Sequence, residues 1–285
     1  MSKIFSMVEG SFGKVVVIEA CHDLVMHAHS ELEFGYWLSG GQCRFGVSDR
    51  AVVCSESQAI AINKYQAHDL SLNDAAEPVM LLQLYLCESW FDEQFTHLGA
   101  PISFQNAQLI HTDEMKTRCW QLTQKILFAN QNSQTIENDV VALLQATITS
   151  CITDANSYQN AVRKKNLDDR LRLALSCIQD NITNPNLIQI LPKLVGVSRS
   201  RLYELFKDEL QSTPNLIRNC VLLDNAMKRI VDKQQDLAFI SEQLGFSAAA
   251  NFSRFFRENT GVTPTAFRNG TSPLLTKSTG STGLA

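Results

Sequence analysis

The stretch ISEQLGFSAAANFSRFFRENTGVTPTAFR, residues 240–268, predicts two short helices joined by a turn. Gly245 would end the first helix in the left-handed backbone conformation that only glycine adopts at low cost. Ser247 then offers a hydroxyl group that would cap the second helix. In that helix Phe252, Phe255 and Phe256 share one face and would be buried. The opposite face carries small or basic residues: Ala249, Ala250, Ser253, Arg254 and Arg257. An apolar back and a basic front are typical of a helix-turn-helix.

The same pattern occurs a second time in residues 190–218, which read ILPKLVGVSRSRLYELFKDELQSTPNLIR. Gly196 stands 49 positions before Gly245, whereas Thr213 and Thr263, each followed by proline, are 50 positions apart. We therefore place one extra residue within the second recognition helix. In both copies threonine supplies a cap and proline takes the first helical position. A repeat with matching turns is far more specific than a single match, and it favours a double DNA-binding unit over a purely structural repeat.

The charges divide between two halves of the chain, whose 285 residues suggest about two domains. Residues 1–162 contain 8 Lys and Arg against 18 Asp and Glu, a balance of −10. Residues 163–285 contain 17 against 11, a balance of +6, and the two halves together give the net charge of −4. Because the basic half coincides with the repeat, the charge pattern indicates DNA as the partner of that half.

The composition is that of an ordinary globular protein, with 45% hydrophobic and 19% charged residues. No run reaches the length of a membrane span, and the start MSKIFSMVEG lacks the apolar core of an export signal. The eight cysteines form no CxxC pair, which predicts reduced and mostly buried thiols. We therefore expect a cytoplasmic protein that has no membrane partner.

Residues 1–105 predict a small β-barrel, because short β-branched or apolar runs alternate there with turn residues. His27, His29 and Glu33, followed by His68, resemble the two histidine motifs of cupins. Strand alternation points His27 and His29 to one face. Three imidazoles and a carboxylate suit a transition metal, so these four residues are candidates for a metal site or for a metal-free effector pocket. The match is partial, since these positions depart from the cupin pattern: Cys21, Ser57, Asn63, Tyr65 and Leu72.

Four further segments complete the expected domain organisation. Residues 106–157 predict a pair of helices, suited equally to dimerisation and to covering the barrel. Residues 158–166 are polar and basic and predict a linker, and residues 167–268 hold the double helix-turn-helix. Within that domain a long helix over residues 214–231 would fix the distance between the recognition helices. Residues 269–285 are rich in Ser, Thr and Gly and predict a flexible tail.

With a double helix-turn-helix behind a cupin-like region, the chain resembles the AraC/XylS family of transcription regulators. The resemblance is close over residues 165–268 and looser in the N-terminal half. It implies binding to double-stranded promoter DNA, activation through contacts with RNA polymerase, and an effector bound in the N-terminal domain. A homodimer is a further expectation, through the predicted helical pair.

The resemblance also implies which side chains face the DNA. The recognition helices near residues 198–210 and 247–259 would present the following set: Arg199, Ser200, Tyr203, Glu204, Lys207, Ala249, Ala250, Asn251, Arg254 and Arg257. Arginine suits guanine or phosphate, whereas alanine meets only a thymine methyl group. Glu204 departs from the family, and an ion pair with Arg201 or Lys207 is its alternative role. Pro192 departs too, and it would remove a hydrogen bond from the first scaffold helix.

We therefore predict an α+β chain of two domains, a cupin-like barrel with a helical hairpin followed by an all-α domain with two helix-turn-helix units. The expected function is that of an effector-responsive activator of transcription, which is not an enzyme and needs no cofactor. Two alternatives stay open. One is a metal-dependent cupin enzyme, holding a divalent metal in its barrel and fused to a DNA-binding domain. The other is an effector-independent regulator whose barrel only dimerises.

Overall fold

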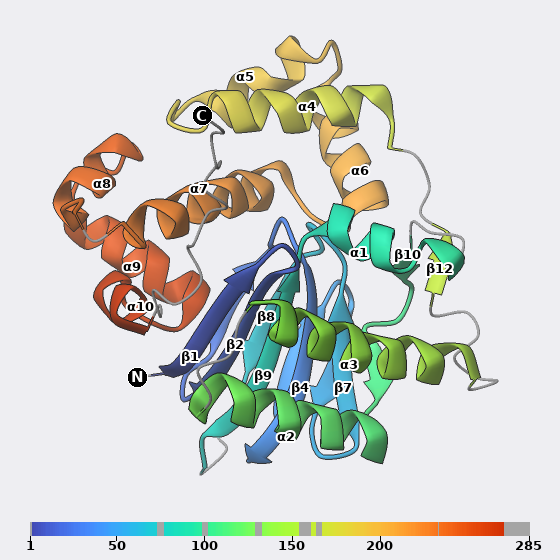
Figure 1. Cartoon of the computed structure of the whole chain (residues 1–285). Coiled ribbons are helices and arrows are strands. Elements are labelled where there is room, and N and C mark those ends of the chain that lie inside the picture. The colour runs from blue at the N-terminus through green and yellow to red at the C-terminus, as the bar shows by residue number, and fades with distance from the viewer. Residues whose placement is uncertain are drawn as a thin grey trace, which may run out of the picture.

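A computed structural model describes residues 2–72, 77–98, 102–128, 133–153, 161–163, 167–232 and 234–270. Its N-terminal part is built on β-sheets with helices across one face, and its C-terminal part is entirely helical (Figure 1). The predicted tail beyond residue 270 lies outside the described residues. No described helix combines the length and the hydropathy that a bilayer span requires.

The strands form two main sheets. The six-stranded sheet has the order β1-β2-β9-β4-β7-β11 and the four-stranded sheet the order β3-β8-β5-β6. All neighbouring strands in both sheets run antiparallel. The strands are β1 Lys3–Gly10, β2 Gly13–Ala20, β3 Leu24–His27, β4 Leu32–Gly40, β5 Cys43–Val47, β6 Arg50–Cys54, β7 Gln58–Ile62, β8 His68–Ser71, β9 Val79–Leu86, β10 Ile102–Phe104, β11 Gln108–Ile110 and β12 Ala161–Arg163.

The predicted closed barrel is not confirmed. Among the described residues, strand β1 pairs only with β2, so the six-stranded sheet keeps a free edge. At that end of the sheet β1 contacts helix α10 of the C-terminal half, where closure of a barrel would require another strand. Of the predicted linker, residues 158–166, only residues 161–163 are among the described residues, and they form β12, which pairs with β10.

Alternation along the central strand β9 decides which face each side chain takes. Leu82, Leu84 and Leu86 are buried in the core beneath the helices that cover the sheet. Gln83 and Tyr85 point to the opposite face, as a period of two requires. The covering helices are α1 Glu88–Gln94, the 3-10 helix η1 Thr96–Leu98, α2 Asp113–Phe128 and α3 Ser133–Thr153 (Figure 1).

The C-terminal half consists of two helical units at the two ends of one long helix, α7 (Figure 1). Thr213 caps α7 by accepting from Leu216 N, and Pro214 takes its first position, as predicted. The first unit is centred on buried Phe206 and the second on buried Phe256. The helices are α4 Asp169–Asp180, α5 Leu187–Leu194, α6 Arg199–Leu210, α7 Pro214–Ile230, α8 Leu237–Gln243, α9 Ala249–Thr260 and α10 Pro264–Gly270.

The recognition helices α6 and α9 are both 12 residues long and begin 50 positions apart. The extra residue therefore lies in the turn before α9, and its predicted place within the helix was wrong. For the same reason Ser247 is not the cap. Ala248 takes the cap position without a side-chain hydrogen bond, and the Ser247 hydroxyl accepts from Asn251 Nδ2 at 3.0 Å. Phe255 is only half-buried, although the sequence predicts it in the core.

The glycines of the two turns offer a test of the repeat. Gly196 and Gly245 have φ of +71° and +80°, but a Cβ at Gly245 would lie 3.3 Å from Thr183 O, whereas one at Gly196 meets nothing within 4 Å. We expect Gly196→Ala to lower the free energy of unfolding by about 1 kcal/mol and Gly245→Ala by about 2 kcal/mol, since only the second adds a contact to the backbone strain. Urea unfolding of both variants measures the difference, and equal losses would contradict it.

Candidate DNA-binding surface and interdomain cavity

The recognition helices turn the predicted DNA contacts away from the core. Of the ten predicted side chains, Tyr203 is half-buried and the others are exposed: Arg199, Ser200, Glu204, Lys207, Ala249, Ala250, Asn251, Arg254 and Arg257. The buried faces hold Leu202 and Phe206 in α6, and Phe252 and Phe256 in α9. Each helix is thus anchored from behind and free to enter a groove, although contact of these residues with DNA stays a prediction.

Two contacts on α6 organise its outer face. The guanidinium group of Arg199 lies 5.7 Å from the centre of the Tyr203 ring, within the range of a cation–π interaction. Glu204 forms an ion pair with Arg201 at 3.3 Å, which is one of the roles left open by the sequence. Both partners of this pair are exposed, so it contributes little to stability. Its effect is to set a positive charge beside the carboxylate that would otherwise repel phosphate.

The C-terminal end of α6 rests on the N-terminal half of the chain. Gln211 ends the helix with φ of +50°, and Gly261 ends α9 at the equivalent position, 50 residues later, with φ of +73°. The second unit has glycine at this position. The first has Gln211, whose side chain forms hydrogen bonds with the N-terminal half. Gln211 Oε1 accepts from Ser48 Oγ and Gln66 Nε2, and Gln211 O accepts from Ala67 N at 3.2 Å.

The corresponding end of α9 also meets the N-terminal half. A Cβ on Gly261 would lie 3.2 Å from the Leu24 side chain and 3.3 Å from Ser2 Oγ. Between the two helix ends, Ser30 donates a hydrogen bond to Asp224 Oδ2 of α7. The N-terminal half therefore contacts both recognition helices at equivalent points and the helix that joins them.

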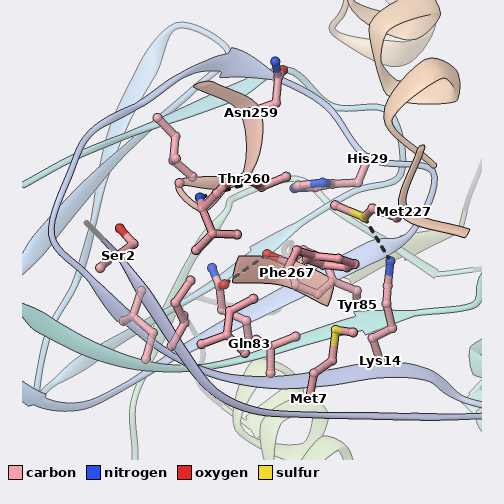
Figure 2. Close-up of a pocket in the computed structure, with 18 of the residues that line it drawn as sticks. Ser2, Met7, Lys14, His29, Gln83, Tyr85, Met227, Asn259, Thr260 and Phe267 are labelled. Carbon is pink, nitrogen blue, oxygen red and sulfur yellow. Dashed lines mark hydrogen bonds between the residues drawn. The ribbon is translucent and has the colours of Figure 1, made fainter. Parts of the chain in front are cut away.

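A cavity lies at the second of these contacts, between strands β1, β2 and β9 and helices α7, α9 and α10 (Figure 2). Its volume is about 70 Å³. Gly261, Thr260 and Asn259 at the end of α9 line one wall (Figure 2). Much of the remaining wall is apolar: Ile4, Met7, Val16, Ile18, Leu81 and Phe267.

One half-buried cation, Lys14, lines the cavity among acidic groups. Lys14 Nζ is 2.8 Å from Glu31 Oε1 and donates to Met227 Sδ at 4.0 Å (Figure 2). Burial alone would lower the pKa of Lys14, but the Glu31 carboxylate outweighs it and raises that pKa. Burial raises the pKa of Asp224, and the negative charge of Glu31 raises it further. At the polar end of the cavity, charged side chains thus connect β2 electrostatically to α7.

The structure brings all four cupin-like residues together. One ring nitrogen from each of His27, His29 and His68 falls in a group whose atoms all lie within 4.8 Å of one another. Glu33 Oε2 lies 2.9 Å from His29 Nε2 and 3.2 Å from His68 Nε2. Gln83 Nε2 donates to the other Glu33 oxygen at 3.1 Å, and His29 and Gln83 also line the cavity. His27 and His29 lie close together, although β3 ends at His27 and His29 lies in the following loop, where the predicted strand alternation does not apply.

The electrostatics of the cluster follow from burial beside a carboxylate. Burial and the two neighbouring imidazoles hold the pKa of His27 well below its ordinary value. Burial also acts to lower the pKa of His29, but the adjacent Glu33 outweighs it and raises that pKa. Burial acts to raise the pKa of Glu33, and His29 and His68 together bring it below its ordinary value instead. The carboxylate is therefore ionised, and it stabilises the protonated form of His29.

Comparison with known proteins places the helical half in a family. A family model described as a helix-turn-helix domain matches residues 191–270. The arabinose operon regulatory protein of Escherichia coli is 30% identical over 105 residues, 36% of each chain. The probable transcriptional regulator LumQ of Photobacterium leiognathi is 23% identical over 231 residues, which cover 80% of this chain and 86% of LumQ.

Residues 191–270 therefore form a helix-turn-helix domain similar to those of transcriptional regulators. The match to the arabinose operon protein spans about a third of that relative, so it concerns only part of that protein. The likeness in fold extends further. A structure of apo ToxT from Vibrio cholerae superposes with a TM-score of 0.63 at 12% identity, covering 91% of this chain and 97% of ToxT. The likeness in fold therefore covers both the sheet-containing half and the helical half of this chain.

Sequence reasoning missed the cavity between the two halves of the chain. Lys14 and Glu31 belong to the N-terminal half, whereas Asp224 and Met227 lie on α7, about two hundred positions away. No motif links these residues, because their meeting depends on how the two halves pack. The one available signal was a lysine inside a β-branched strand, which requires a buried partner.

Proposed function

We propose that the chain is a transcription activator in which an effector in the interdomain cavity sets the geometry of the two recognition helices. The observation that carries this proposal is that the N-terminal half contacts equivalent positions of the two units, Gln211 and Gly261. Of these two residues, Gly261 lines the cavity. A molecule that enters between the sheet and α9 changes one contact and leaves the other. The second recognition helix then moves relative to the first.

The distance between the recognition helices matters because successive major grooves on one face of B-DNA lie about 34 Å apart. Helix α7 has 17 residues and is therefore about 25 Å long. It joins the two units, and the N-terminal half holds both ends, so a displacement at either end changes the fit to promoter DNA. Contact with RNA polymerase belongs to the proposal as the means of activation, and the site of action is the cytoplasm.

The effector class follows from the cavity wall. An apolar lining with one half-buried ammonium group, Lys14, suits an amphipathic anion. ToxT, which shares the fold at 12% identity, has been solved with an unsaturated fatty acid bound. A cavity of about 70 Å³ is smaller than the several hundred Å³ that organic ligands usually occupy. A fatty acid therefore enters only as α7 and α10 move away from the sheet, which couples binding to motion.

A titration with oleate tests the effector class. We expect oleate to bind the full chain and Lys14→Met to weaken that binding at least tenfold, because a charged hydrogen bond is lost. Methyl oleate, which has no carboxylate, should bind both proteins alike. Lys3→Met removes an exposed lysine from the neighbouring strand and serves as the control. Equal oleate affinity of all three proteins would refute the role of Lys14.

The remaining partner in this proposal is a second copy of the chain, which would form a homodimer through α2. Trp120 and Phe128 on this helix are 47% and 83% exposed, which is unusually high exposure for aromatic residues. They lie eight positions apart and so share one side of the helix. Dimerisation there would leave the recognition helices free, and sedimentation of the full chain measures it.

A further inference from the structure

The histidine cluster carries an inference that does not depend on the effector or on DNA binding. Its four side chains come from different elements: His27 ends β3, His29 follows in the next loop, Glu33 lies on β4 and His68 begins β8. All four are buried or nearly so, with side-chain exposures of 12% for His29, 2% for Glu33 and 1% for His68. Such polar groups are drawn together away from water only if something satisfies them.

The hydrogen bonds at the edge of the cluster determine which ring nitrogens carry a proton and which hold a lone pair at its centre. His27 Nδ1 lies 2.7 Å from Val25 O, and His68 Nδ1 lies 2.9 Å from Gln66 O. Because a carbonyl oxygen only accepts, both Nδ1 atoms carry the proton, and in the neutral rings both Nε2 atoms hold lone pairs. His68 Nε2 is 2.9 Å from His29 Nε2 and 3.2 Å from Glu33 Oε2. The Nε2 atoms of His29 and His68 and the Oε2 atom of Glu33 therefore converge, and a ring nitrogen of His27 lies within 4.8 Å of those of the other two histidines.

We propose that His27, His29, His68 and Glu33 bind a divalent first-row transition-metal ion. Metal–nitrogen and metal–oxygen bonds of about 2.0–2.1 Å place ligand atoms about 2.9–3.4 Å from one another around the ion. The distances of 2.9 Å and 3.2 Å between the Nε2 and Oε2 atoms fall within that range. Three imidazoles and one carboxylate suit zinc, iron, cobalt or nickel better than calcium or magnesium.

Hydrogen bonds around the cluster hold the proposed ligands in place, as metal sites require. Backbone carbonyls fix the rings of His27 and His68, and Gln83 holds Glu33 while accepting from Tyr85 OH at 3.0 Å. Such outer hydrogen bonds orient the ligands of bound metals. Because His29 and Gln83 also line the cavity (Figure 2), the ion would lie beside it.

Cobalt binding tests the site directly. The full chain is produced without a histidine tag, stripped with a chelator, and titrated with Co²⁺ and then Zn²⁺. We expect one Co²⁺ per chain, visible d–d bands of a nitrogen- and oxygen-ligated ion of low coordination number, and loss of those bands on adding Zn²⁺. His68→Gln should weaken binding more than tenfold. His111→Gln, which replaces a buried histidine outside the cluster, should bind as the wild type does.

Each outcome decides the question. Absence of stoichiometric uptake by the wild-type chain would overturn the proposal, and the cluster would then be a proton-sharing network around Glu33. Equal uptake by His68→Gln and wild type would do the same, since the ion would lie elsewhere. Circular dichroism checks that the variant folds. If it does not, the less buried His29→Gln takes its place, and X-ray absorption of the wild-type cobalt complex counts the imidazole ligands.

Discussion

Replacing Phe256 by alanine should lower the free energy of unfolding by about 3–5 kcal/mol. The Phe256 side chain is fully buried at the centre of the second helix-turn-helix. Its ring centre lies 6.1 Å from that of Phe252 and 5.4 Å from that of Phe267. Removing it opens a cavity among three helices and also loses two aromatic contacts. Because it anchors the back of α9, the variant should bind DNA poorly even where it remains folded.

Urea denaturation followed by fluorescence and circular dichroism measures this loss. Phe239→Ala is the matched control, because Phe239 lies in the same unit but is 52% exposed, and it should change stability by no more than about 0.5 kcal/mol. Similar effects of the two substitutions would mean that Phe256 does not support the unit as the packing indicates.

The second large effect concerns Arg254, which points outward from the middle of α9. If its guanidinium group reads a guanine in the major groove, Arg254→Ala should weaken binding to the promoter site by about 1–3 kcal/mol. The loss should be concentrated at one base pair, because the contact is to a base edge. Mobility shifts at a fixed salt concentration, with a set of single-base variants of the site, measure it.

Arg118→Ala is the control for this measurement, since it deletes an exposed arginine that pairs with Glu114 on α2. It should leave DNA binding unchanged. A uniform weakening by Arg254→Ala across all sites, with a shallower dependence on salt, would instead make Arg254 a phosphate contact. No weakening at all would remove α9 from the proposed interface.

The helical half could be predicted because its signals are local. Gly196, Gly245 and the Thr-Pro pairs each specify a turn by their own conformational preferences, and the Phe spacing specifies the buried face. The location of the extra residue could not be predicted, because cap preferences favour Ser247, whereas α9 begins after Ala248. Only the tertiary position of α9 decides between them.

The N-terminal half was harder because its geometry depends on distant pairing. His27 and His29 lie close together, but His29 is in the loop after β3, so strand alternation does not account for it. The cupin-like spacing led to Glu33 and His68. The free edge at β1 could not be predicted, since a strand sequence does not say whether its outer side meets another strand or a helix. The meeting of Lys14 with Asp224 likewise required the packing of the two halves.

The contacts at Gln211 and Gly261 have a thermodynamic consequence. The N-terminal half contacts the ends of both recognition helices. Binding of an effector to that half and binding of DNA to the helices are therefore coupled. If an effector changes the affinity for DNA by some factor, linkage requires that the duplex change the affinity for the effector by the same factor. Effector affinity measured on the free protein would then differ from that of the promoter-bound form, which is the form that acts in transcription.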